Sequence, residues 1–255
     1  MSRVLEVLAA HPGVTVQDAG RPGLLARGVS RGGAVDPLAL AEAAALLGEA
    51  PGAAAVEMAG HGGTFRVRGG GAVIALTGAP MRASVDGAPL RWPGSHALPE
   101  GAVLTIGPAA RGGYGYLSIA GGIATEPVLG SRAAHLAAGI GRPLAAGDTL
   151  PLGAPEAGAR APGYTLTPRA RFEGGTLRVL PGAQTAAFSK AQRARFEREA
   201  FAKDTRANRQ GVRLRPEGAG FHAEGGLSVT SEAIVPGDIQ IVGGGAPFVL
   251  LAECQ

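Results

Sequence analysis

The segment 14–23 constrains the fold of this chain more than any other part of it. It begins with a short apolar strand pattern and then places Gln17, Asp18 and Arg21 among glycines and a proline. Large apolar side chains are almost missing from this loop, so burial of its own residues cannot hold it in place. Its backbone must be held by what it packs against, and its polar groups must meet each other or a ligand. Both outcomes remain open from the sequence.

The helix signal that follows is sharper. Asp36 and Pro37 occupy the places of an N-cap and of a first helical residue, and an apolar run leads from them to Gly48. An acidic N-cap, proline at the first position and glycine just past the end are typical helix boundaries. We expect a helix over 38–47.

Glycine and proline predict the rest of the architecture. The chain holds 43 Gly and 19 Pro, about a quarter of its 255 residues, without a collagen period. Many turns imply many short strands, so we expect a mainly β protein with a few helices. We predict two β-rich lobes, over 1–153 and 169–255, joined by a linker over 154–168. Strands are expected at 4–8, 64–68, 72–76, 81–85, 103–106, 114–120, 176–180, 212–214, 227–230, 238–242 and 247–252, with a charged helix at 185–201.

Charge and cysteine content narrow the function classes. The formal charge is +4 and the basic residues concentrate between 190 and 215, but aromatic residues form only 4% of the chain. Nucleic acid is therefore the weaker hypothesis, and a solvated face or a site for an anionic substrate is favoured. The single cysteine, Cys254, excludes an internal disulfide. No signal sequence or membrane-length apolar run is found, so we expect a cytoplasmic protein with no membrane partner.

Metal, nucleotide and covalent chemistry lack their usual motifs. No two of the five histidines are spaced as metal ligands on a helix, so no metal site is predicted. The glycine runs 69–71 and 243–245 are not followed by Lys-Ser/Thr, so this chain is not expected to bind ATP alone. No Gly-x-Ser-x-Gly elbow surrounds a serine.

Several matching segments together resemble one family. They are 14–23, 28–37, 75–79, 116–122, 128–132, 141–152, 177–182, 208–214, 231–240 and 247–255, and they span nearly the whole chain. The chain resembles allophanate hydrolase subunit 2, also called the biotin-dependent carboxyltransferase or KipA family. That family includes the C subunit of prokaryotic 5-oxoprolinase and part of urea amidolyase. The family normally continues past the point that corresponds to Gln255, so the C-terminal lobe is expected to be shorter than in the family.

The resemblance implies a cyclophilin-like β-barrel and partner subunits. The expected partner is a subunit-1 protein, similar to KipI or to the B component of 5-oxoprolinase, with a LamB/YcsF-like A component as a further candidate. Related enzymes act on small amides and carboxylated ureas. No cofactor is expected to be bound tightly by this chain. ATP would be used by the assembled complex, and biotin would be supplied only by another protein.

Three hypotheses follow for function. The first is a subunit of an ATP-dependent 5-oxoprolinase, with an allophanate hydrolase or carboxyltransferase subunit of urea amidolyase as its alternative. Its polar candidates are proton-handling carboxylates, Asp18, Asp36 and Glu232, and groups for a small anionic substrate, Gln17, Arg21, Thr77, Arg209, Ser231 and Gln240. The second is a KipA-like regulator that binds a KipI-like kinase inhibitor, and the third is a basic nucleic-acid binder. Under the first, we expect the early turn and the late Arg209 region to share one hollow.

Overall fold

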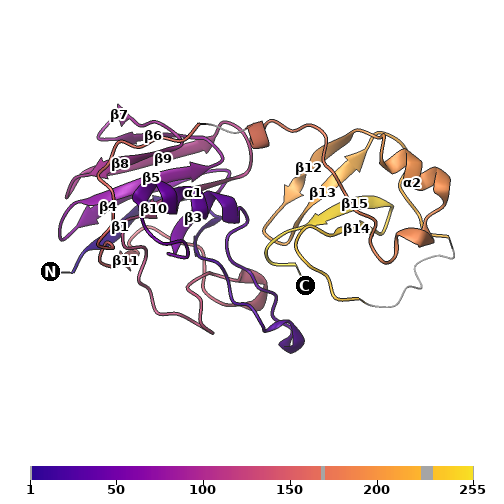
Figure 1. Cartoon of the computed structure of the whole chain (residues 1–255), viewed down its shortest axis with the longest axis horizontal. Helices are drawn as coiled ribbons and strands as arrows, with labels where there is room; N and C mark the ends of the chain where they lie inside the picture. Colours follow the sequence, from indigo (N-terminus) through magenta and orange to yellow (C-terminus); the bar gives the residue numbers. More distant parts are fainter. Residues whose placement is uncertain (1, 168–169, 225–231, 255) are drawn as a thin grey trace. The chain divides into compact units, whose positions relative to one another are not determined.

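The computed structural model describes residues 2–167, 170–224 and 232–254 (Figure 1). Contacts group the chain into two units, residues 1–23 with 32–174 and residues 24–31 with 175–255, and each is described by itself. The segment expected as a linker contacts the first unit, since the Arg160 and Gly163 amides donate to the Leu47 and Ser95 carbonyls. The predicted lobe boundaries stay a prediction.

Two antiparallel sheets build the first unit. One has six strands in the order β11 (Thr149–Pro151), β1 (Val4–Ala10), β4 (Gly63–Arg68), β9 (Val103–Ala109), β6 (Met81–Val85) and β7 (Ala88–Pro89). The other has five, in the order β2 (Val14–Gln17), β3 (Ala55–Ala59), β10 (Tyr114–Ile119), β5 (Ala72–Gly78) and β8 (Gly94–Leu98). All of their pairings are antiparallel, with hairpin and longer connections.

One apolar core joins these two sheets. Phe65 and Leu104 from the six-stranded sheet and Val56, Ile74 and Leu117 from the five-stranded sheet belong to the same cluster, and all are fully buried. Alternate residues of each strand face this core, as the period of two requires. The prediction of a mainly β fold is confirmed.

Helix α1 (Pro37–Leu47) covers the outer face of the five-stranded sheet. Asp36 caps it by accepting a hydrogen bond from the Ala39 amide, and Gly48 ends it in a left-handed conformation with φ +70°. Its buried Ala43 packs in one cluster with Ala75 of the sheet. The predicted helix and both of its boundary signals are confirmed.

The second unit contains a four-stranded antiparallel sheet. Its order is β12 (Phe201–Ala207), β13 (Gly211–Pro216), β15 (Ala246–Leu250) and β14 (Ile239–Val242), and helix α2 covers Lys190–Phe196. Phe196 lies 5.1 Å from Phe201 and 5.3 Å from Phe221 between ring centroids, so three aromatic rings form the centre of this unit.

Two expectations for this unit are wrong in part. Residues 176–180 form no strand, and Leu177 and Leu180 are 80% and 92% exposed, because the described chain offers no neighbouring strand to pair with them. The helix expected at 185–201 is shorter, since Phe188 is extended and Ser189 caps a new start. The strand expected at 227–230 lies outside the described residues.

Membrane insertion by a helix finds no support in the described part of the chain. None of the helices there combines the length and the apolar character that a bilayer crossing needs.

Candidate functional site

A row of buried polar side chains crosses the outer face of the five-stranded sheet. Thr15 lies opposite Glu57, Glu57 opposite Tyr116, and Tyr116 opposite Thr77, on four successive strands. All four residues have no exposed surface. Directly opposed residues of antiparallel strands point to the same face, so this row runs beneath the first turn of α1. Buried polar groups need partners, and these find them in that turn.

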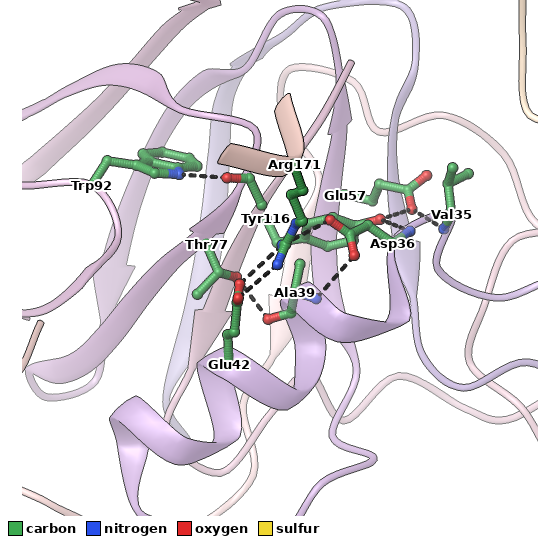
Figure 2. A network of polar contacts seen from close by, with 10 residues as sticks. Val35, Asp36, Ala39, Glu42, Glu57, Thr77, Trp92, Tyr116 and Arg171 are labelled. Carbon is green, nitrogen blue, oxygen red and sulfur yellow. Dashed lines mark hydrogen bonds and ion pairs between the residues drawn. The ribbon is translucent and has the colours of Figure 1, made fainter. Parts of the chain in front are cut away.

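Glu57 and Tyr116 hold the chain that enters α1 (Figure 2). The Tyr116 hydroxyl donates to Glu57 Oε2 at 2.6 Å, and the Val35 amide donates to the same oxygen at 2.8 Å. The Asp36 amide donates to the Tyr116 hydroxyl at 2.8 Å. Burial, with the negative charge of Glu57, raises the pKa of Tyr116 well above its ordinary value of 10.0. The phenol therefore stays protonated and donates permanently.

Arg171 closes the network at its half-exposed end (Figure 2). Its guanidinium donates to Glu42 at 2.6 and 3.0 Å and to Asp36 Oδ2 at 2.9 Å. The side chains of Arg171, Asp36 and Glu42 are 22%, 21% and 16% exposed. Burial alone would lower the pKa of Arg171, but hydrogen bonds and charges from Glu42 and Asp36 outweigh it and raise that pKa. The trio carries one positive and two negative charges and is reached by solvent.

Thr77 connects the sheet to the same helix. Its hydroxyl donates to the Ala39 carbonyl at 2.9 Å. Of the residues predicted for the substrate site, Asp36 and Thr77 thus come together at the N-terminal turn of α1. That Asp36 is catalytic and that Thr77 binds substrate stay predictions.

The early loop forms a second polar cluster in the same unit. Asp18 accepts three hydrogen bonds: from the Gly20 amide at 2.8 Å, the Ser131 hydroxyl at 2.6 Å and the Arg132 amide at 2.7 Å. Asp18 is 8% exposed. These contacts give the carboxylate a positioning function, because they tie residues 131 and 132 to the loop.

Gln17 and Arg21 grip the same segment. The Gln17 amide donates to the Ala134 carbonyl at 3.1 Å, and the Arg21 guanidinium donates to the Ala133 carbonyl at 2.5 Å and to the Val128 carbonyl at 3.4 Å. Gln17 and Arg21 are 0% and 1% exposed. In these contacts the polar groups of the early loop meet the chain itself, which is one of the two outcomes that its sequence left open. Their roles toward a substrate stay predictions.

The late candidates lie in the second unit. Arg209 Nε pairs with Glu253 Oε1 at 2.5 Å, and the two side chains are 7% and 2% exposed. Gln240 lies on β14 opposite Phe248, Glu232 is exposed, and Ser231 lies outside the described residues. Because each unit is described separately, the hollow expected to join the early and late residues stays a prediction.

Metal binding finds no donor set in the described residues. Over 2–167, 170–224 and 232–254, no group of three or more His, Cys, Asp or Glu side chains is placed to hold an ion.

The comparison with protein families decides what kind of protein this is. The model of the carboxyltransferase domain, subdomains A and B, matches residues 27–255. The chain belongs to this carboxyltransferase family. The resemblance inferred from the sequence is therefore confirmed.

Curated relatives of this carboxyltransferase domain are named as the C subunit of 5-oxoprolinase. The protein from Escherichia coli K12 is 33% identical over 258 residues, which cover 99% of this chain and 81% of the relative. The protein from Haemophilus influenzae is 29% identical over 256 residues, with the same coverage.

Solved structures agree with the carboxyltransferase fold. TTHA0988 matches with a TM-score of 0.84 and 34% identity over 99% of this chain, which spans about half (49%) of that protein. The urea carboxylase of Kluyveromyces lactis matches with a TM-score of 0.79 and 26% identity over 98% of this chain and 24% of the enzyme.

Sequence reasoning missed most of the carboxyltransferase chain's polar network. Glu57, Tyr116, Glu42, Arg171 and, in the second unit, Glu253 were not among the candidates. Glu57 alone had a usable signal, since a single carboxylate interrupts the apolar run 53–59. A charge in such a run is either paired or functional. The other four became visible only through partners distant in the sequence.

Proposed function

We propose that this chain is a subunit of an ATP-dependent 5-oxoprolinase that converts 5-oxoproline to L-glutamate. The observation that carries the proposal is the alignment of 99% of the chain with two relatives named as the C subunit of 5-oxoprolinase. A lettered subunit works with others, so we infer two partners. One is similar to the subunit-1 protein (KipI-like, or like the B component), and the other to the LamB/YcsF-like A component. Activity then belongs to the assembly.

Asp36 is the group that we assign to proton handling. Its carboxylate is partly exposed and is oriented on both oxygens, by the Ala39 amide and by Arg171. A positioned carboxylate can accept a proton from an attacking water or return one to a leaving amide nitrogen. Glu57 and Tyr116 support it from behind by fixing the backbone at residues 35 and 36.

The substrate carboxylate needs a cation from elsewhere. The Asp36 trio has a net negative charge, and Arg21 and Arg209 already bind groups of their own unit. A bound anion would therefore have to displace Glu253 from Arg209 or meet a cation of a partner subunit. Ser231, Glu232 and Gln240 stay candidates for the remaining contacts.

The partner subunits are assigned the use of ATP. This chain's glycine runs lack the lysine and hydroxyl residue of a phosphate-binding loop. Biotin would take part only if another protein carried it.

Reconstitution tests the proposal. The purified chain is mixed with the other 5-oxoprolinase subunits of the same organism, and 5-oxoproline-dependent glutamate and phosphate release are measured. Both should require this chain. Asp36→Asn should lower glutamate formation by about a hundredfold or more. Glu173→Gln, which removes an exposed carboxylate paired with Arg111 in the same unit, is the matched control and should leave the rate unchanged.

Two other results would point elsewhere. Activity with carboxylated urea and a biotin-bearing partner, instead of 5-oxoproline, would favour the carboxyltransferase hypothesis, which the likeness to urea carboxylase supports. Tight binding of the subunit-1 protein with no turnover of either substrate would favour the KipA-like regulator and contradict the 5-oxoprolinase proposal.

A further inference from the structure

We propose that the first unit holds a binding site for a small apolar α-amino acid, separate from the Asp36 trio. The site is a hollow of about 260 Å³ between the segments 125–134 and 140–150. A hollow of this size suits a small metabolite better than a nucleotide. The inference goes beyond the proposed function and does not depend on it.

The floor of the hollow is apolar. Val16, Ala133, Ala134, Leu144 and Leu150 line it, and all five are buried. A ligand with a short hydrocarbon part would replace water over these side chains, which favours its binding.

The wall of the hollow is held rigidly. Residues 128–134 are bound by the side chains of Gln17, Asp18 and Arg21 through the contacts described above. A wall that is already in place lowers the conformational cost of binding. The early loop, which was predicted to bind a ligand directly, would then act through the segment that it positions.

The turn in this wall is strained. The Val128 and Ser131 amides and carbonyls bond each other across a two-residue turn, and Leu129 in it has φ +53° with 57% of its surface exposed. Asparagine or glycine normally occupies such a position. Strain of this kind persists where the surrounding contacts determine the conformation, and it clusters at binding sites.

Two charged side chains at the rim are paired with each other. Arg142 donates to both oxygens of Asp148 at 2.8 and 2.6 Å. The hydrogen bonds from Arg142 and from the Ala145 amide hold the pKa of Asp148 below its ordinary value. This pair stays ionised and is neutral as a whole, so it selects neither cations nor anions.

The other two charged side chains of the lining are available. Arg132 uses Nε to donate to the Thr125 carbonyl at 2.7 Å, and its two terminal nitrogens bond nothing in the part of the chain that the structure describes. The Glu126 carboxylate likewise has no partner among these described residues. The rim thus offers one guanidinium for a carboxylate and one carboxylate for an ammonium group.

Opposite charges beside an apolar floor match an amphoteric ligand. Arginine binds a carboxylate through two parallel hydrogen bonds, and Glu126 would bind an ammonium group. A ligand with both groups on one carbon and an apolar side chain uses all three features. That combination is an apolar α-amino acid.

Titration calorimetry of the isolated chain with L-leucine tests the site. Two analogues separate its charges, since 4-methylpentanoate lacks the ammonium group and 3-methylbutylamine lacks the carboxylate. We expect saturable leucine binding with a dissociation constant in the range of about 1 mM or below, and binding of each analogue weaker by about tenfold or more.

Variants assign the contacts. Arg132→Gln should weaken leucine by about tenfold or more and leave 3-methylbutylamine unchanged, whereas Glu126→Gln should weaken leucine and leave 4-methylpentanoate unchanged. Arg111→Gln, which removes an exposed arginine outside the hollow, is the control. All three positions are exposed, so melting temperatures should match the parent protein.

Two results would overturn the proposal. One is the absence of saturable heat up to about 10 mM leucine, and the other is binding that neither Arg132→Gln nor Glu126→Gln weakens. Neither result bears on the reconstituted 5-oxoprolinase assay, because this experiment uses neither ATP nor any other protein.

Discussion

Replacing Tyr116 with phenylalanine should destabilise the first unit by about 3–5 kcal/mol. The change removes one oxygen and leaves the ring, so no large cavity forms. It deletes a hydrogen bond to the buried Glu57 carboxylate, which is worth about 1.5–3 kcal/mol. It also leaves the Asp36 amide without its acceptor, which costs about 1–3 kcal/mol if no water replaces the hydroxyl.

Urea unfolding followed by circular dichroism measures this loss. Tyr164→Phe is the matched control, because that ring is 48% exposed and stacks with Arg160, so its stability should change by less than about 0.5 kcal/mol. The double variant with Glu57→Gln completes a cycle that isolates the coupling between the two side chains. We expect a coupling of about 1 kcal/mol or more, because the two groups are in direct contact.

The reasoning fails if Tyr116→Phe unfolds at the same urea concentration as Tyr164→Phe. It also fails if the effects of Tyr116→Phe and Glu57→Gln simply add. Either result would mean that the buried row is satisfied by water or by relaxed partners, and that the entry to α1 does not depend on the phenol.

Three further changes have clear directions. Leu129→Asn should stabilise the protein by about 1 kcal/mol in thermal unfolding, because asparagine tolerates φ +53° and the exposed leucine loses little burial; a lower melting temperature would contradict this. Arg209→Ala should cost about 3–5 kcal/mol by leaving Glu253 buried and unpaired, and labelling of buried Cys254 by a thiol reagent should speed up, whereas Arg111→Gln should label like the parent. Stability should fall as pH rises above about 10, because the unfolded chain releases the Tyr116 proton there while the folded protein, with its raised pKa, retains it. In Tyr116→Phe this part of the alkaline loss should disappear, and an identical alkaline slope in both proteins would refute the assignment.

Local chemistry was sufficient for the elements whose signals lie within a few residues. Asp36, Pro37 and Gly48 mark the ends of α1 because a helix end is satisfied by its own neighbours. Asp86 and Gly87 mark the hairpin between β6 and β7 because only a few residue types accept the positive φ values of +48° and +86°. Alternating patterns likewise located most strands of the first unit.

Patterns that depend on a distant partner were insufficient. Residues 176–180 have the composition of a strand, but a strand also needs a neighbour for its backbone hydrogen bonds, and none is present in the described chain. Arg209 was predicted to bind a substrate carboxylate, and only the tertiary structure shows Glu253, 44 residues away, at that guanidinium.

The sequence by itself determined the fold class, the family and the polar character of the early loop. Only the tertiary structure decided that Gln17, Asp18 and Arg21 grip residues 128–134, and that Glu57, Tyr116 and Thr77 form one row across three strands. The physical reason is that register and sheet order bring these groups together, and both are set by the packing of the whole unit.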